Sequence, residues 1–223
     1  LRGKSHNGIA VFLGIPYGED TRSRRFQAPL PPSPWTHVRD AFVWGDRAPQ
    51  LSGRGGMAAR AHTAPSAGTS ESYHLPPDEG ASSEDCLHLN VWTPSPSRKG
   101  HERRPVLVYI HGGAYNGCTV NSVLYDGTRL CKRGDVVVVT VNHRLNAFGF
   151  LYLAGVTDDP AYADSGNVGM LDLVLALKWV QDNIAQFGGD PTRVTIFGQS
   201  GGGAKCATLM AMPPAHEKVH RVM

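Results

Sequence analysis

VTIFGQSGGG, residues 194–203, places a serine between glycines directly after an apolar, β-branched run. This order predicts a strand, a very sharp turn and then a helix, with Ser200 at the turn. A Cβ at either glycine position that flanks the turn would clash, which explains Gly198 and Gly202. The turn presents the serine Oγ at the tip of a strand, where neighbouring backbone N–H groups point toward a developing oxyanion. The stretch therefore indicates acyl transfer through a serine ester.

A second motif favours the same chemistry. PVLVYIHGGA, residues 105–114, is typical of a buried strand that runs into His111-Gly112-Gly113. Glycines at a strand exit let the backbone approach a substrate carbonyl oxygen, and N–H donors fixed there are worth about 3–4 kcal/mol each. A plain Gly/Ser turn is the alternative for residues 194–203 taken alone, because the chain has 26 glycines. Two such motifs in this chain order favour the catalytic interpretation.

Beyond these motifs, the chain resembles the type-B carboxylesterase/lipase family, which includes the cholinesterases. The matching stretches are GIPY (14–17), SEDCLHLNV (83–91), NHRLNAFGFL (142–151) and the segment from GNVG to FGGDP (166–191). The resemblance implies an α/β-hydrolase fold, in which a mostly parallel central sheet has helices on both faces. It also implies that residues 1–223 are the N-terminal portion of one such domain.

The resemblance assigns roles within the two motifs. Ser200 is the expected nucleophile, and the N–H groups of Gly112, Gly113 and Gly201 are the expected oxyanion hole. The elbow departs from the family's usual Gly-Glu-Ser-Ala-Gly, because Gln199 removes a charge beside the nucleophile and Gly201 loosens an oxyanion N–H. These changes affect the expected rate and leave the chemistry in place. The residues expected to line the substrate pocket are Tyr115, Asn116 and Gln199.

The general base and its acidic partner are expected outside this chain segment. In this fold the chain order is serine, acid, histidine. After the elbow the chain offers only His216, Glu217 and His220, which follow the elbow helix too closely to reach back to the serine. His111 is expected to hold the oxyanion loop through a ring hydrogen bond. The remaining C-terminal part of the same enzyme is therefore an expected partner, and residues 1–223 alone are not expected to be a stable, active enzyme.

Composition excludes several other classes. Hydrophobic residues make up 41% and charged residues 18%, as in ordinary globular proteins. A scattered net charge of +3 gives no argument for nucleic-acid binding. No apolar run reaches the roughly 18 residues that a membrane span needs. Serine acyl transfer requires neither a cofactor nor a metal, and the four cysteines have no metal-ligand spacing. A small-molecule ester is the expected substrate.

Cysteine use bears on the compartment. By resemblance, Cys86 lies where secreted family members place one half of a small disulfide loop, yet no cysteine precedes it here. The chain also has no N-x-S/T sequon. Both features favour a bacterial protein, either cytoplasmic or exported without this bridge.

Periodicity predicts the order of the elements. Strands are expected at 9–13, 87–92, 106–110, 136–141 and 194–197, and helices at 168–187 and 201–212. Asn167 is the expected N-cap of the first helix. Asp172 is expected to interact only weakly with the positive end of the helix dipole. Residues 45–83 lack a clear period and are interpreted as an irregular surface excursion, with a disordered insert as the alternative. By resemblance, Arg25 and Glu84 form a salt bridge.

Three functions remain compatible with the sequence. The first is an active serine carboxylesterase that works through an acyl-enzyme. The second is a non-catalytic, cholinesterase-like interaction module, which the retained Ser200 and His111-Gly112-Gly113 argue against. The third is a lactonase, thioesterase or amidase on the same site, which fold-level analogy leaves open.

Overall fold

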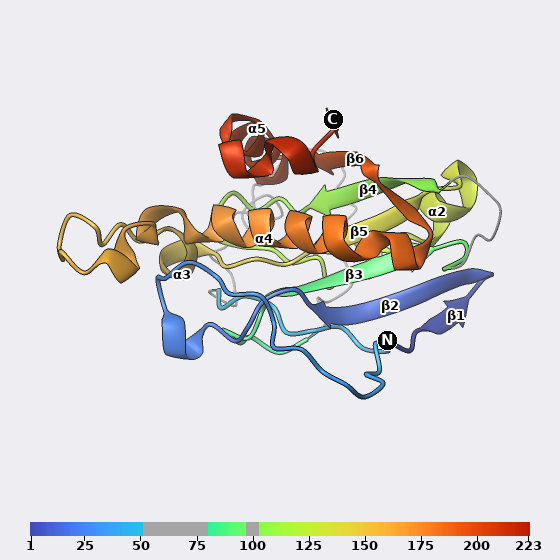
Figure 1. Cartoon of the computed structure of the whole chain (residues 1–223), viewed down its shortest axis with the longest axis horizontal. Helices are drawn as coiled ribbons and strands as arrows, with labels where there is room; N and C mark the ends of the chain where they lie inside the picture. The colour runs from blue at the N-terminus through green and yellow to red at the C-terminus, as the bar shows by residue number, and fades with distance from the viewer. Residues whose placement is uncertain (51–79, 97–102) are drawn as a thin grey trace, which may run out of the picture.

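The computed structural model describes residues 1–50, 80–96 and 103–223. The central part of the expected 45–83 excursion, residues 51–79, lies outside the described residues. One sheet of seven strands runs through the described chain, in the order β1-β2-β3-β5-β4-β6-β7 (Figure 1). The strands are β1 (Lys4–His6), β2 (Ile9–Pro16), β3 (His88–Thr93), β4 (Arg104–Ile110), β5 (Val137–Val141), β6 (Gly189–Gly198) and β7 (Arg221–Val222).

The sheet is mixed. β5, β4, β6 and β7 pair in parallel, as the strand–helix alternation predicts. The N-terminal strands β1, β2 and β3 add antiparallel pairs, and β3 joins β5 antiparallel. The hairpin between β1 and β2 turns through Asn7 and Gly8, both with positive φ, as tight hairpin turns require. The parallel half carries the two sequence motifs.

Helices cover both faces of the sheet (Figure 1). They are α2 (Thr128–Gly134), α3 (Asn146–Phe150), α4 (Val168–Asn183) and α5 (Gly201–Ala211). Short 3-10 turns occur at Arg22–Arg24, Val123–Tyr125, Pro160–Tyr162, Ser165–Asn167, Ile184–Phe187 and Pro213–Lys218. The larger core cluster lies between the sheet and α4, and a smaller one joins β2, β3 and β5 to α2. No helix within the described ranges is long and apolar enough to cross a bilayer.

The sequence of β5 shows why helices must cover both faces of the sheet. All five of its residues are buried. Val137, Val139 and Val141 belong to the larger core cluster, and Val138 belongs to the cluster under α2. Alternate side chains of a strand point to opposite faces, so a run of valines without polar alternation serves a sheet buried on both sides. The expected strand at 136–141 is thus confirmed to within one residue.

Three details of the predicted elements need correction. The helix expected at 168–187 continues as α4 only to Asn183, and then tightens into a 3-10 turn that stops at Gly188, where φ is +77°. Asn167 occupies the N-cap position, but its side chain makes no capping hydrogen bond. β6 begins at Gly189 rather than Val194, because Gly189 already pairs with Arg104 before a register irregularity.

Asp172 has a different role from the weak helix-end interaction that the sequence suggested. It is fully buried, and its carboxylate accepts hydrogen bonds from Arg144 Nη2 at 2.6 Å and Nε at 2.9 Å. The backbone N–H of Arg144 also donates to it, at 3.0 Å. Arg144 Nη1 binds the carbonyl of Gln27 at 2.9 Å. This buried pair ties the segment after β5 to α4 and to the N-terminal loop.

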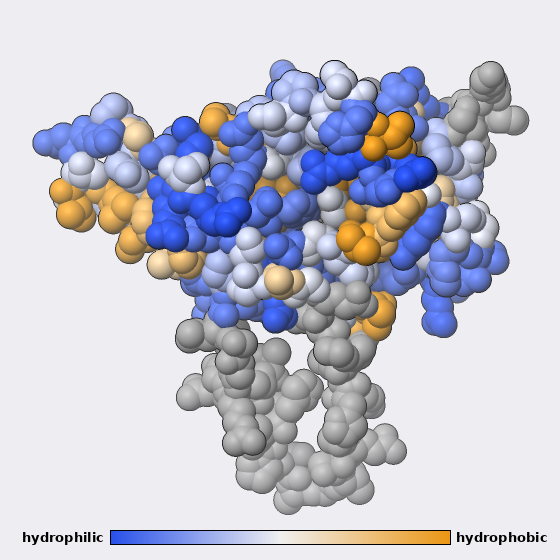
Figure 2. Space-filling view, turned by 90° about the horizontal axis from the view of Figure 1, so that it is seen from below, coloured by the Kyte–Doolittle hydropathy of each residue, from blue (hydrophilic) through white to orange (hydrophobic). Residues whose placement is uncertain are grey.

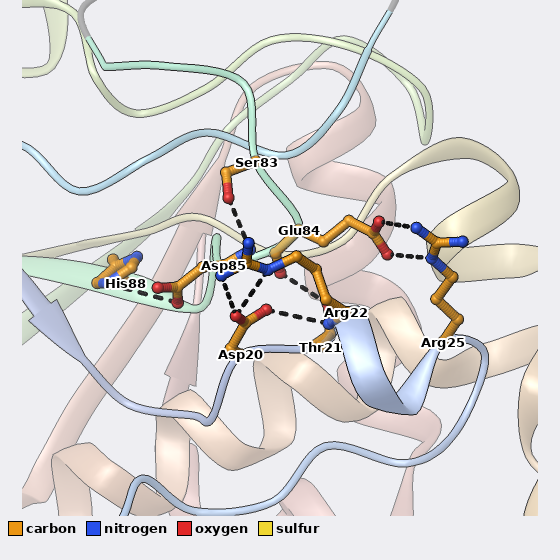
Figure 3. Close-up of polar contacts among 8 residues, drawn as sticks. All are labelled: Asp20, Thr21, Arg22, Arg25, Ser83, Glu84, Asp85 and His88. Atoms are coloured by element: carbon orange, nitrogen blue, oxygen red, sulfur yellow. Dashed lines mark hydrogen bonds and ion pairs between the residues drawn. The ribbon is translucent and has the colours of Figure 1, made fainter.

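The expected pair of Arg25 and Glu84 is present, in a network that joins the N-terminal loop to the segment before β3 (Figure 3). Arg25 Nε and Nη2 donate to the two carboxylate oxygens at 2.7 and 2.5 Å. Thr21 Oγ1 donates to the Glu84 carbonyl at 2.7 Å. The side chain of Arg25 is 54% exposed, so water screens the pair. Its main effect is to fix where the two segments meet.

Some apolar surface is exposed at one end of the molecule. The segment from α3 to α4 projects at the left of Figure 1, and Figure 2 shows hydrophobic surface at the same end. Two of its apolar residues, Leu151 and Val156, are exposed. Isolated exposed apolar residues are normal on protein surfaces, so this patch carries no functional assignment by itself.

Candidate active site

The two glycine-containing motifs meet at one edge of the sheet. β4 and β6 are adjacent and parallel, and Ile110 at the end of β4 pairs with Gly198 at the end of β6. Parallel strands end at the same edge, so the loop at 111–114 and the elbow at 199–202 leave the sheet side by side. The carboxyl edge of the strands is where open α/β sheets place their binding sites.

Ser200 sits in a strained conformation on the elbow. Its φ of +57° and ψ of −122° are values that residues with a Cβ rarely adopt. Its side chain is exposed, and α5 begins with the next residue. A Cβ on Gly202 would overlap the carbonyl oxygen of Ile110, and one on Gly198 would lie 2.5 Å from the Gly202 carbonyl carbon. Backbone atoms thus occupy the space that a Cβ would need, which confirms that both positions require glycine.

The loop after β4 packs closely on this elbow. A Cβ on Gly112 would lie 2.7 Å from Gln199 Oε1 and 3.6 Å from Ser200 Cβ. Gly113 has a φ of +77°, and its carbonyl accepts the N–H of Gly117 at 3.1 Å. A Cβ on Gly201 would lie 2.5 Å from Ala114 Cα, so there is no room for the alanine usual at this position without a backbone shift. Gly112 and Gly201, two of the residues expected to form an oxyanion hole, therefore lie beside Ser200, and Gly113 follows Gly112 in the loop.

The side chain of His111 bonds to the backbone of its own loop. It is buried, and its Nδ1 lies 2.9 Å from the carbonyl oxygen of Gly112. Because that oxygen can only accept, Nδ1 carries the proton. Burial lowers the pKa of His111 to about 3, with help from the Lys205 charge, so the ring is neutral at working pH. The expected ring hydrogen bond is thus confirmed.

His143 completes this layer. Its ring stacks on His111 with centroids 4.9 Å apart and an interplanar angle of 9°. Its Nδ1 donates to the carbonyl of Arg144 at 2.8 Å. Burial also lowers the pKa of His143, and the neighbouring His111 and Lys205 lower it further. Two stacked neutral rings therefore support the loop from β4 against the segment after β5.

Sequence reasoning missed Lys205. It lies one turn after Gly201 on α5, it is fully buried, and its Nζ donates to the Ala114 carbonyl at 2.6 Å. A second contact joins Nζ to the His111 carbonyl at 3.3 Å. The available signal was a lysine four residues after Gly201, on the same face of a helix that begins with small residues. That spacing marks a cation facing the oxyanion loop.

The expected pocket residues lie around the same edge. The ring of Tyr115 meets Phe150 edge-on at 5.0 Å. Asn116 and Gln199 are exposed. The start of the 45–83 segment approaches here as well: Asn146 Nδ2 donates to Pro49 O at 2.6 Å, and Gln50 Nε2 to Cys118 O at 3.0 Å. A role of Tyr115, Asn116 and Gln199 in substrate binding stays a prediction.

The histidines after the elbow bond elsewhere. His216 Nε2 donates to the carbonyl of Met210 at 3.1 Å, beyond the middle of α5. His220 Nδ1 accepts the N–H of Val194 at 3.2 Å. Val194 lies four residues before Gly198, which is roughly 13 Å along a strand. Neither contact brings an imidazole to Ser200. This agrees with the expectation that these two histidines do not reach the serine.

Comparison with known proteins decides the family. The model of the carboxylesterase family matches residues 1–223. The chain belongs to the carboxylesterase family. Among curated carboxylesterase relatives, para-nitrobenzyl esterase of Bacillus subtilis is 43% identical over 216 residues, which are 96% of this chain and 39% of the relative. Phenmedipham hydrolase of Pseudarthrobacter oxydans is 40% identical over 224 residues, which are 100% of this chain and 40% of the relative.

Solved carboxylesterase structures agree with the fold. The enzyme of Geobacillus stearothermophilus superposes with a TM-score of 0.83 at 42% identity, and covers 100% of this chain and 40% of its own. An esterase of Clostridium hathewayi gives a TM-score of 0.84 at 42% identity, with the same coverage. The fold is therefore that of an α/β-hydrolase. The chain spans about two fifths of the length of these carboxylesterases.

The carboxylesterase elbow gives a matched pair of predictions. Gly202→Ala should lower the free energy of unfolding by about 1–3 kcal/mol, because its Cβ forces the Ile110 carbonyl to move. Gly203→Ala should leave stability unchanged or raise it by up to about 1 kcal/mol, because its Cβ meets only Gly198 O at 3.5 Å and alanine favours the helix. Denaturant unfolding of both variants checks this, and equal effects would contradict it.

Proposed function

We propose that the complete protein containing this chain is a serine carboxylesterase, in which residues 1–223 supply the nucleophile and the oxyanion hole. The observation that carries the proposal is the juxtaposition of Ser200, strained and exposed, with Gly112 of the loop after β4. Family membership and esterase relatives support ester hydrolysis as the overall reaction. A strained turn that aims a hydroxyl at a loop of fixed N–H groups serves acyl transfer.

The proposed reaction proceeds in two steps. Ser200 Oγ attacks the ester carbonyl carbon as a general base takes its proton, and the oxyanion accepts hydrogen bonds from Gly112, Gly113 and Gly201. The intermediate collapses, the alcohol leaves with the proton, and water then hydrolyses the acyl-serine. We propose that the base is a histidine oriented by a carboxylate, and that both follow residue 223. His111 is unsuited to this role, because it is buried and because a pKa of about 3 makes its ring too weak a base.

The experiment is a pre-steady-state test of the acyl-enzyme. The complete protein, mixed with a p-nitrophenyl ester, should release a burst of nitrophenol close to one equivalent per chain before steady turnover. Mass spectrometry of the quenched reaction should find the acyl group on the peptide that contains Ser200. Turnover with the acyl group on another residue, or no covalent intermediate under conditions that trap one in a reference esterase, would refute the proposal.

A further inference from the structure

Lys205 is buried where a lysine is costly. Its side chain is fully buried, and lysines are almost never fully buried unless they are paired. In the described part of the chain no carboxylate forms an ion pair with it. Its contacts are two backbone carbonyls and the face of Tyr115, whose ring centroid lies 5.3 Å from Nζ. A buried ammonium held only by one loop indicates a function for that loop.

The two carbonyls bracket the residues expected to bind the oxyanion. The C=O of His111 and the N–H of Gly112 belong to one planar trans peptide, in which the two groups point in opposite directions. Holding the oxygen toward Lys205 therefore holds the Gly112 N–H away from it. The ring of His111 acts in the same way on the next peptide, because it binds the Gly112 carbonyl and so fixes the Gly113 N–H.

The second carbonyl fixes the end of the loop. Lys205 Nζ lies 2.6 Å from the oxygen of Ala114, a short distance typical of a charge-assisted hydrogen bond. Gly201, one turn earlier on α5, packs against the backbone of Ala114. The first turn of α5 thus holds Ala114 at two points, by van der Waals contact and by charge.

We propose that Lys205 is a positioning residue of the oxyanion hole, which anchors the loop at 111–114 from beneath so that its N–H groups are fixed before substrate binds. The inference rests on the proposed esterase function. An ammonium at the carbonyl end of a peptide also polarises that peptide, which makes its N–H a stronger donor to the oxyanion. Loss of the ammonium should therefore lower kcat more than it changes KM.

The surroundings make this anchor sensitive to alkaline pH. Among the described residues, the titratable groups that face Lys205 are His111 and His143 from the loops after β4 and β5, Tyr115 and Cys118 from the residues that follow the loop at 111–114, and Cys206 beside it on α5. Burial lowers the pKa of Lys205 to about 8, although the two cysteines oppose the shift. The charge is therefore lost as the pH rises through about 8, and the uncharged amine that remains is a weaker donor to the two carbonyls.

Alkaline pH affects stability in the opposite direction from turnover. The unfolded chain, with an ordinary lysine pKa of 10.5, holds this proton between pH 8 and 10.5 while the folded chain releases it. The contribution of Lys205 to the free energy of unfolding therefore rises with pH across this window. A fall in turnover above pH 8 that comes from Lys205 is thus separable from unfolding.

The test compares Lys205→Met, Lys205→Arg and Lys178→Met in the complete protein. Lys205→Met should lower kcat for a p-nitrophenyl ester by about 10- to 100-fold with KM changed less than about threefold. Lys205→Arg keeps a charge that does not titrate, so it should recover part of kcat and lose the decline centred near pH 8. Lys178 is exposed on α4, paired with Asp182, and its replacement should leave kcat unchanged.

The outcomes separate this inference from the proposed function. A wild-type protein that forms no acyl-Ser200 ends both. An active wild type with Lys205→Met at full kcat, or with the same alkaline decline in Lys205→Arg, overturns the Lys205 assignment alone. If Lys205→Met fails to fold, Lys205→Gln takes its place in the comparison. Full kcat in the folded variant overturns the anchor, and a kcat about tenfold lower with KM little changed supports it.

Discussion

Ser200→Ala should reduce kcat/KM for a p-nitrophenyl ester by about 10⁴- to 10⁶-fold, the size of effect seen when a serine hydrolase loses its nucleophile. The reason is local, because Ser200 carries the hydroxyl at the strained turn that packs beside Gly112. Labelling by a fluorophosphonate should disappear in parallel. Ser5→Ala, on the exposed edge strand β1, removes a hydroxyl without touching the site and should keep full activity.

A second substitution at the same position measures the strain. Glycine adopts positive φ without a Cβ penalty, whereas Ser200→Ala keeps the strained geometry. Ser200→Gly should therefore be at least as stable as Ser200→Ala, even though glycine loses more entropy on folding. A Ser200→Ala variant that retains more than about one hundredth of wild-type turnover would remove Ser200 from the mechanism. An alanine variant that is more stable than the glycine variant would contradict the strained conformation of Ser200.

Asp172→Ala should lower the free energy of unfolding by about 3–5 kcal/mol, because it leaves the buried Arg144 guanidinium without its carboxylate. Arg144 is 2% exposed and Asp172 is not exposed at all, so water cannot replace the lost partner. The segment after β5 should loosen as a consequence, since the Arg144 N–H also binds this carboxylate. Chemical denaturation monitored by tryptophan fluorescence measures the change in a folded preparation of the complete protein.

Glu84→Gln is the matched control for this pair. It weakens an equally short arginine–carboxylate pair, but Arg25 is half exposed and water solvates it once the pair is broken. The shift in unfolding midpoint should be much smaller than that of Asp172→Ala. Replacing both buried partners, with Arg144→Met and Asp172→Leu, should recover part of the loss and not all of it, because the bond to Gln27 is also lost. Equal effects of the exposed and buried substitutions would contradict burial as the cause.

Local patterns explain what could be predicted. A valine run without polar alternation indicates a strand buried on both faces, and β5 is such a strand. Gly198 and Gly202 indicate a turn too tight for side chains, and in the structure backbone atoms fill the space that a Cβ would need. These features depend on neighbours within a few residues, so they can be read along the chain. The roles of Ser200, Gly112, Gly113 and Gly201 remain predictions that the kinetic tests address.

Features that depend on distant partners were missed or misjudged. Asp172 was expected only to interact weakly with the positive end of its helix, because its partner Arg144 is 28 residues away in sequence. Lys205 was missed because its position on the same helix face as Gly201 does not show that it is buried, and the carbonyl it holds is 91 residues away. The antiparallel pairs of β1, β2 and β3 escaped for the same reason, since the strand–helix alternation describes only the parallel half.

The sequence by itself determined five of the strands, the two longest helices, the elbow around Ser200 and the family, because β-branched runs, glycine positions and helical periodicity are local properties. It did not indicate β1, β7, α2 or α3. The tertiary structure decided which strand ends meet, and so which loops share an edge: the register of β4 against β6 puts Gly112 beside Ser200. It also decided which charges are buried. Desolvation and pairing are set by the groups that folding brings around a side chain, and not by its neighbours along the chain.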